Sequence, residues 1–324
     1  MVEIASRARS RDREALGFLA SLVFTGLAAV RDVYLGGLFQ RLSPLLVAVV
    51  AFTLCAAVFL PIALFRNPGS LRLLLRRPRE LFWINATTAV AWIAFFHALR
   101  ITEPLLVQIL FSGIGPLSIV WMTPQRRSHA ERLGHLGLLA AIILAAAVNL
   151  AGMSGGTPQP FGVAVLGIAL ATFAGFSISV STVLCRRLND AGVDPTALVA
   201  LRFLGAVALA AALTGPAGQS IRTLATPETA TVVIGASLLL VVFPIYVNQL
   251  GIALASPLTV RVGLAVGPVL IFVLQLLEGR LAPSRPSLAC AVLYGVVAIA
   301  GAEIRRRAIR QAPPGSPYRK PMTT

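Results

Sequence analysis

The sequence predicts an all-α, polytopic membrane protein with ten transmembrane helices. Of its 324 residues, 57% are hydrophobic and only 12% are charged, whereas a soluble domain carries charge on about a quarter of its residues. Windows of about 20 apolar residues, the length that crosses a hydrocarbon core of about 30 Å, occur ten times and join mostly through short loops. They are 16–39, 43–65, 81–99, 103–123, 133–153, 161–184, 195–213, 229–250, 254–277 and 286–303.

The distribution of basic residues predicts the orientation of these helices. The chain has 28 Lys and Arg against 12 Asp and Glu, a net charge of +16. Twenty of the basic residues lie in the N-terminal arm (1–15), in the loops after the second, fourth and sixth spans, and in the C-terminal tail (304–324). Five lie in the alternate loops. This positive-inside pattern predicts cytoplasmic termini in a plasma or inner membrane. The basic clusters then face anionic membrane lipids, which argues against nucleic acid as a partner.

Neither the cysteines nor the histidines form a pattern typical of a metal or catalytic centre. Cys55, Cys185 and Cys290 lie in or beside three different spans, without the spacing of a metal site or a disulfide framework. The chain lacks HExxH, Gly-x-Ser-x-Gly and phosphate-binding loop motifs. We therefore expect no metal, no cofactor and no enzymatic activity. The first span is too long for a signal-peptide core and predicts an uncleaved helix.

Two independent stretches of the chain recur at offsets of 151 to 153 residues. The matched positions are Pro44/Pro195, Phe52/Phe203, Pro104/Pro257, Gly115/Gly267 and Pro116/Pro268. Each half contains five predicted spans, an odd number, so the second half must enter the membrane in the opposite orientation. The sequence thus predicts an inverted repeat, an architecture typical of carriers that bind a solute near the bilayer midplane.

Of four short features of the second half, three recur in the first. The second half has Ala253-Leu254, Pro268, Glu278 and the segment LYGVVAIAGA. The first half has Ala98-Leu99, Pro116 and GLLAAIILAAAVNLAG, but Arg126 stands where the glutamate is expected. With these motifs the chain, from about residue 16 to residue 303, resembles the EamA-like members of the drug/metabolite transporter superfamily.

The resemblance implies a fold and a class of function. It implies two five-helix EamA-like repeats, at 16–153 and 161–303, with the first, third, fourth, sixth, eighth and ninth helices around a cavity. It also implies export of a small organic metabolite, such as an amino acid or a drug-like compound, although nothing in the residues enforces the direction. A membrane-embedded enzyme and a non-transporting structural subunit are the alternatives. The chain lacks the catalytic motifs that an enzyme would need, and it shows no pore segment.

Charged residues inside the spans are the first candidates for a substrate site, because burying a charge in a membrane is costly. Arg31 and Asp32 lie together in the first span. Neighbouring residues of a helix point about 100° apart, so we expect only partial mutual neutralisation. Arg31 is a candidate to anchor an anionic group and Asp32 a candidate to bind a cation or a proton. The alternative is a pair that anchors the helix near the interface.

Two further arginines lie within the second half. Arg261, in the ninth span, is a candidate to hold a carboxylate or a phosphate through its planar guanidinium. Alternatively, its side chain extends to the cytoplasmic interface. Arg202, in the seventh span, is interpreted as structural, either paired or extended toward the basic loop.

Neutral polar and aromatic residues form a second set of candidates. Spacings of three and four residues place the members of each group on one helical face, where they either line the cavity or bond helices together. They are Asn85, Thr88 and Trp92 in the third span, Gln108 and Ser112 in the fourth, and Tyr246 and Gln249 in the eighth.

Two prolines and a set of small residues predict where helices bend and pack. Pro116 and Pro268 each follow a glycine near mid-span. They are candidate hinges for a rocking carrier, or else static bends. The Gly263-xxx-Gly267 motif and the Ala-rich fifth and tenth spans favour close helix packing, including packing between two copies of a homodimer.

Overall fold

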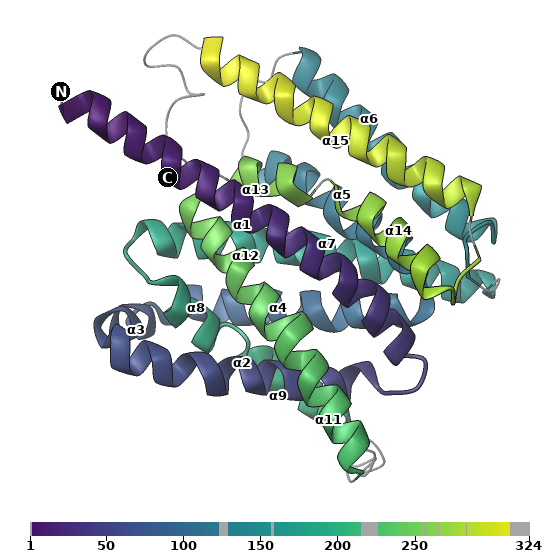
Figure 1. Ribbon diagram of the computed structural model, residues 1–324, viewed down its shortest axis with the longest axis horizontal. Helices are drawn as coiled ribbons and strands as arrows, with labels where there is room; N and C mark the ends of the chain where they lie inside the picture. Colours follow the sequence, from purple (N-terminus) through teal and green to yellow (C-terminus); the bar gives the residue numbers. More distant parts are fainter. Residues whose placement is uncertain are drawn as a thin grey trace.

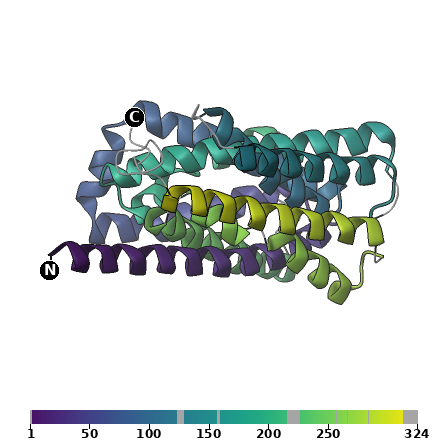
Figure 2. The same ribbon diagram turned by 90° about the horizontal axis from the view of Figure 1, so that it is seen from above.

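The computed structural model is all-helical over the residues that it describes, which are 2–122, 129–156, 159–214, 226–255, 257–264, 266–282 and 284–311 (Figure 1). Seven helices are long and apolar enough to cross a membrane, and three apolar helices are shorter. The prediction of an all-α polytopic membrane protein is therefore confirmed at this level. The helices run roughly along one common direction (Figure 2).

The first half of the chain consists of continuous helices. Proline occupies the first position of α2, α3, α4 and α5, where its missing N–H leaves no hydrogen bond unmade. The helices are α1 (Val2–Leu38), α2 (Pro44–Arg66), α3 (Pro68–Leu75), α4 (Pro78–Ile101), α5 (Pro104–Met122) and α6 (His129–Leu150).

In the second half, three stretches of apolar sequence are divided into shorter helices. A turn at 202–203 divides one stretch, a π-helical segment (η2) interrupts a second, and in the third one helix ends at Leu264 and the next begins at Gly267. The elements are α7 (Phe161–Asp190), α8 (Pro195–Leu201), α9 (Leu204–Thr214), α11 (Pro227–Ala236), η2 (Ser237–Val242), α12 (Phe243–Leu254), α13 (Pro257–Leu264), α14 (Gly267–Glu278) and α15 (Arg285–Gln311).

Several helices extend beyond the predicted spans. Helix α1 begins at Val2, so the N-terminal arm continues the first span as helix, and α15 continues past 303 to Gln311. Helix α3 was not predicted. The predictions followed apolar windows, whereas a helical backbone satisfies its own hydrogen bonds in water as well as in lipid. Residues 312–324 of the predicted tail lie outside the described residues.

The first helix of each half packs mainly against the other half. Helix α1 contacts α12, α13 and α14, and α7 contacts α4 and α5. Helix α2 lies against α8 and α9, and α6 lies beside α15 (Figure 1). We call the end of the bundle that holds α3 and the turn at 191–194 the basic end. The end that holds residues 102–103 and 279–282 is called the Glu103 end.

Glycines allow the close approach of these crossed helices. A Cβ atom on Gly17 of α1 would lie 2.5 Å from the Cβ atom of Ala255, at the basic end. A Cβ atom on Gly167 of α7 would lie 2.0 Å from Thr102 Oγ1, at the Glu103 end. Both separations are shorter than real Cβ contacts, so these helix crossings require glycine.

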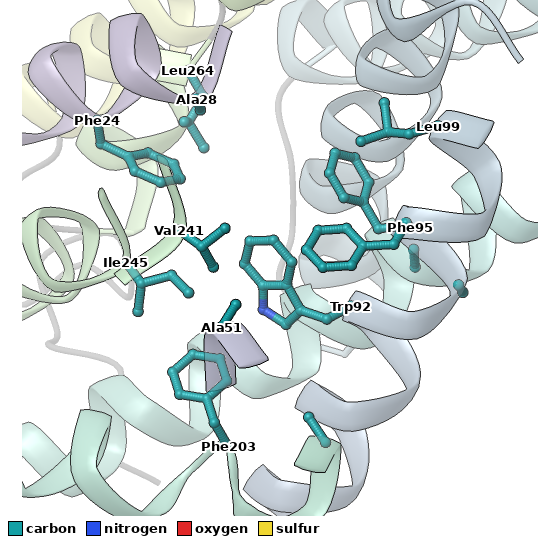
Figure 3. Packing of buried hydrophobic residues seen from close by; sticks show 14 of the residues in the cluster. Phe24, Ala28, Ala51, Trp92, Phe95, Leu99, Phe203, Val241, Ile245 and Leu264 are labelled. Carbon is teal, nitrogen blue, oxygen red and sulfur yellow. The ribbon is translucent and has the colours of Figure 1, made fainter. Parts of the chain in front are cut away.

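Aromatic side chains fill much of the core between the helices. Phe52 of α2 stacks on Phe203, with ring centroids 4.9 Å apart and an interplanar angle of 4°. Phe52 also meets Trp92 edge-on at 5.6 Å and stacks on Phe96 at 6.1 Å. Figure 3 shows the Trp92 ring between Phe95 on one side and Val241 on the other.

Candidate functional site

Arg31 and Asp32 of α1 form a buried ion pair. Both Arg31 Nε and one terminal guanidinium nitrogen lie 2.7 Å from Asp32 Oδ1. The two residues are 2% and 0% exposed. The long arginine side chain curls back to its neighbour, so the two charges pair directly, but the pairing uses only part of each group. The other guanidinium nitrogen, Nη1, and Asp32 Oδ2 are buried and have no hydrogen-bond partner among the described residues.

Aromatic rings surround the guanidinium group of Arg31. Its Cζ atom lies 5.0 Å from the ring centre of Trp92, 5.4 Å from that of Phe95 and 5.9 Å from that of Phe24. These distances allow cation–π attraction. Trp92 Nε1 is also buried without a partner in the described part of the chain. The pair thus presents one unpaired N–H donor group and one unpaired carboxylate oxygen next to three aromatic rings.

The polar residues of α5 are buried as predicted, with atoms left unpaired. Gln108 and Ser112 are 4% and 2% exposed. Gln108 Oε1 and Ser112 Oγ make no hydrogen bond within the described residues. The Gln108 side chain lies against Gly267, where α14 begins. Thr25 of α1 reaches the same region, since its Oγ1 donates to the Gly263 carbonyl at 3.0 Å. Helices α1, α5, α13 and α14 therefore meet around these polar groups.

The polar face of α4 divides between two roles. Asn85 Oδ1 accepts a hydrogen bond from the Gly205 backbone N–H at 2.8 Å, and so holds the start of α9. Thr88 Oγ1 lies 2.8 Å from Ser181 Oγ of α7. Only Trp92, one turn further along, borders the Arg31–Asp32 pair. The predicted common face is real, but its three residues do not converge on one site.

Arg202 lies at the break between α8 and α9 and is 4% exposed. One terminal nitrogen donates to Gln249 Oε1 at 2.8 Å, and the other donates to Ser181 Oγ at 3.2 Å. The side chain does not extend to the interface, because burial and these bonds hold it inside the bundle. Gln249 thus contacts Arg202. Tyr246, on the same helix, instead stacks on Phe59 with centroids 4.8 Å apart.

Three other candidates differ in how far the structure describes them. The side chain of Arg261 lies outside the described residues. Pro116 lies inside the continuous helix α5, whereas Pro268 is the second residue of α14, just after a break. The two prolines, although matched in sequence, therefore occupy different helical environments.

Glu103, which the sequence analysis did not select, joins the two halves at the Glu103 end. Its Oε2 accepts hydrogen bonds from Gly155 N at 3.1 Å and from Ser287 Oγ at 2.8 Å. Burial raises the pKa of the Glu103 carboxyl above its ordinary value, and these two hydrogen bonds oppose the shift. Nearby, Ser284 Oγ donates to Met153 O at 2.6 Å, and Ala282 N donates to Gly155 O at 3.0 Å.

The basic end is closed by a different set of contacts. Arg186, near the end of α7, donates to the carbonyl oxygens of Ile252 and Ala255, each at 2.9 Å. These are carbonyls that the end of α12 leaves without helical partners. Ser70 Oγ accepts from Asp194 N at 2.6 Å, and Thr259 hydrogen-bonds Glu14. Both ends of the bundle are therefore tied across the two halves.

Neither a metal site nor a polar groove adds to this picture within the described part of the chain. No group of three His, Cys, Asp or Glu residues is arranged to hold a metal there. The three cysteines are free and buried. A groove of about 600 Å³ opens between α5, α6 and α7, but its lining is apolar. It is formed by Ile114, Ala146, Leu150, Val165, Ile168, Ala169, Thr172, Phe173 and Phe176.

Comparison with known proteins establishes the fold alone. No protein-family model matches the chain, and no curated protein sequence matches it. Fourteen chains of solved structures match its fold. One of them, described only as a crystal structure of a protein, superposes with a TM-score of 0.62. The match covers 91% of this chain and 99% of that one, at 21% sequence identity.

Proposed function

We propose that the protein is a ten-helix carrier of the EamA-like type that moves a small organic solute by alternating access. The observation that carries the proposal is the stack of Phe52 on Phe203, 4.9 Å apart. The sequence matches these two residues as repeat equivalents, 151 positions apart. Two equivalent residues can face each other so closely only near the axis that relates the two halves. The stack therefore supports a pseudo-two-fold arrangement of the repeats.

Other contacts also occur in related pairs. Gly17 approaches Ala255 at the basic end, and Gly167 approaches Thr102 at the Glu103 end. Gly17 and Gly167 are 150 positions apart, and Thr102 and Ala255 are 153 apart. In the same way, Thr25 bonds the carbonyl of Gly263, while a Cβ atom on Gly175 would lie 2.2 Å from the Phe111 carbonyl oxygen. Equivalent contacts at opposite ends support an inverted repeat, as in many carriers.

The Arg31–Asp32 pair supplies the chemistry for a solute site between the halves. One guanidinium nitrogen and one carboxylate oxygen are buried without partners in the described residues, and the Trp92 and Phe95 rings lie alongside. A buried polar atom without a partner is costly, so a ligand that supplies the missing hydrogen bonds is stabilised there. A small solute with a charged or strongly polar group and an apolar body fits these surroundings.

The contacts at the two ends of the bundle suit a mechanism in which one end opens while the other stays closed. Glu103 and Ser287 close one end, and Ser70 and Asp194 close the other. Opening either set alone exposes the centre to one side of the membrane, which is the requirement of alternating access. By the positive-inside rule the basic end is cytoplasmic in the cell membrane. The resemblance to EamA-like proteins favours export.

Counterflow in liposomes tests this function. The purified protein would be reconstituted and offered labelled amino acids, organic acids, nucleosides and amphiphilic drugs. We expect one chemical class to exchange, with the rate reduced at least tenfold in Arg31→Gln. Arg100→Gln, which removes the same charge from an exposed position, should transport normally. Absence of counterflow for every class would contradict the proposal and favour an enzyme or a structural subunit.

A further inference from the structure

Arg202 is a buried cation whose interactions in the described residues are all with neutral groups. Its guanidinium nitrogens bond Gln249, Ser181 and, at 3.5 Å, Thr88, and its Cζ atom lies 5.0 Å from the Phe203 ring. Arg31, by contrast, is neutralised by Asp32. A buried charge without a counter-charge is strongly unfavourable. The position therefore calls for an anion.

The described carboxylates considered as counter-charges for Arg202 are either on other parts of the bundle or already bonded to another arginine. Glu103 lies 15 residues beyond Thr88, about 22 Å along α4 at 1.5 Å per residue. Glu131 is at the start of α6, and α6 packs on α15, α5 and α7 rather than on α8 or α9. Asp32 gives its one bonded oxygen to Arg31.

Two hydrogen-bond donors of Arg202 and its neighbour Gln249 lack an acceptor. Arg202 Nε and Gln249 Nε2 are both buried and have no partner among the described residues. The two side chains are joined directly, since Gln249 Oε1 accepts from Arg202. Arginine and the amide nitrogen of glutamine are donors only. Donors in surplus around a positive charge are the chemistry of an anion site rather than of a cation site.

The backbone adds to this preference. The helix breaks directly after Arg202, and the 11-residue α9 begins at Leu204. The N-terminus of a helix carries unpaired N–H groups and a partial positive charge, which favours anions. Asn85 satisfies one of these groups, that of Gly205, with a neutral amide oxygen. No acidic side chain of the described residues caps this end.

We propose that Arg202, with Gln249, forms a binding site for a small monovalent anion inside the bundle. The ligand is either the carboxylate of the transported solute or a free halide that accompanies transport. Its link to transport rests on the proposed function, whereas the site itself does not. An aromatic series connects the site to the Arg31–Asp32 pair, because Phe203 stacks on Phe52 and Phe52 meets Trp92.

Anion-dependent thermal stability of the full-length protein in neutral detergent is the first test. The probes are sodium chloride, sodium acetate and sodium benzoate, each titrated against sodium gluconate at constant ionic strength. We expect a saturable rise of about 5 °C in melting temperature with at least one probe, as for a ligand well above its Kd. Arg202→Gln should lose the response, and the exposed control Arg100→Gln should keep it. Equal melting temperatures in every salt would overturn the proposal.

Gln249→Glu provides a test that does not remove the arginine. The substitution keeps the shape of the side chain and places a carboxylate next to Arg202, where the anion would bind. It should raise the melting temperature in gluconate and abolish the response to the probes. If Arg202 only bonds helices together, Gln249→Glu leaves the response unchanged, and the anion site is excluded.

Comparison of the three salts distinguishes the two sources of the anion. Comparison of the anion response with counterflow distinguishes the anion site from the carrier function. Stabilisation by chloride assigns a halide, while stabilisation by acetate or benzoate alone assigns the acid group of a solute. An anion response that is lost in Arg202→Gln, in a protein without counterflow, would retain the site and reject the carrier. Counterflow without any anion response would retain the carrier and reject the site.

Discussion

The two halves of the bundle differ in how their helices carry polar groups. In the first half, α2, α4 and α5 are continuous, and the buried charges of Arg31 and Asp32 on α1 pair with each other. In the second half, a turn at 202–203 separates α8 from α9, η2 interrupts a second stretch, and a third consists of α13, which ends at Leu264, and α14, which begins at Gly267. Ala51 stands in the first half where Arg202 stands in the second. A small apolar residue leaves the helix regular, whereas the buried arginine sits at a helix break.

This difference indicates where the bundle can move. The first half carries most of the fully buried phenylalanines of the core, and these pack on one another between α2, α4 and the turn after α1. The second half contributes backbone that is already interrupted, and breaks and π-segments in helices are common at functional sites. The first half is therefore the more rigid support, and rearrangement is expected mainly in the second.

Loss of the Asp32 charge in the first half is expected to have the largest effect on the free energy of unfolding. Asp32→Asn leaves Arg31 buried without a counter-charge, which typically costs about 3–5 kcal/mol. Chemical unfolding in detergent would measure the loss in the free energy of unfolding. The double variant Arg31→Gln with Asp32→Asn should recover part of that loss, because no uncompensated charge remains. A single variant as stable as the native protein would show that the pair is not buried.

The stack of Phe52 on Phe203 tests whether the two halves meet at the proposed axis. Phe52→Ala and Phe203→Ala should each cost about 3 kcal/mol of unfolding free energy, because both rings are almost fully buried. A double-mutant cycle should show a coupling of about 0.5–1.5 kcal/mol between them. Additive losses in the cycle would mean that the two rings do not interact in the protein.

Loss of the hydrogen bonds of Glu103 is expected to have a smaller effect on the free energy of unfolding, and one that depends on pH. Glu103→Ala removes the acceptor of two hydrogen bonds, and should cost about 1–3 kcal/mol. Because burial raises the carboxyl pKa in the folded protein, the protonated form stabilises the fold. That contribution is complete below the ordinary carboxyl pKa and declines as the pH rises through the raised pKa.

Glu103→Gln is the matched control for this pH dependence. It keeps a carbonyl oxygen for Gly155 and Ser287 but cannot ionise. Melting temperatures measured from pH 4 to pH 8 should therefore fall more steeply in the native protein than in Glu103→Gln. Parallel curves for the two proteins would show that Glu103 does not ionise in that range or is not buried.

The matched prolines predict the smallest effect on stability. Pro268 occupies an early helical position, where proline is favourable, so Pro268→Ala should change the unfolding free energy by less than about 1 kcal/mol. Pro116 lies within α5 and prevents one backbone hydrogen bond, so Pro116→Ala should straighten that helix. Counterflow should slow more in Pro116→Ala than in Pro268→Ala. Equal rates would mean that the proline inside α5 takes no part in transport.

The sequence predicted much of the helical pattern because apolar length is a strong signal in a membrane protein. It missed the helix breaks, which depend on tertiary contacts. Gly205 bonds Asn85 on another helix, and Gly263 of α13 and Gly267 of α14 lie against α1 and α5. Proline marks many helix starts, but Pro116 lies inside α5 whereas Pro268 is at the start of α14, so proline alone does not distinguish a helix interior from a helix start.

The candidate site was predicted less completely than the fold. Burial of Arg31, Asp32, Thr88, Trp92, Gln108, Ser112 and Gln249 follows from the cost of polar groups at membrane depth. Their partners do not follow, because helical spacing gives a face and not the helix that meets it. Glu103 was not selected because it lies at the end of a predicted span, 103–123. A signal was present, since an acidic residue directly before a helix-starting proline suits the N-terminus of a helix.

The crossed packing of α1 has a consequence for how the protein is made. Its main contacts are with α12, α13 and α14, which are synthesised more than 200 residues later. Until those helices have entered the bilayer, the Arg31–Asp32 pair and the glycine face of α1 lack their final neighbours. The first helix therefore completes its contacts only after most of the chain has been synthesised, and a chain cut after α11 would lack the main neighbours of α1.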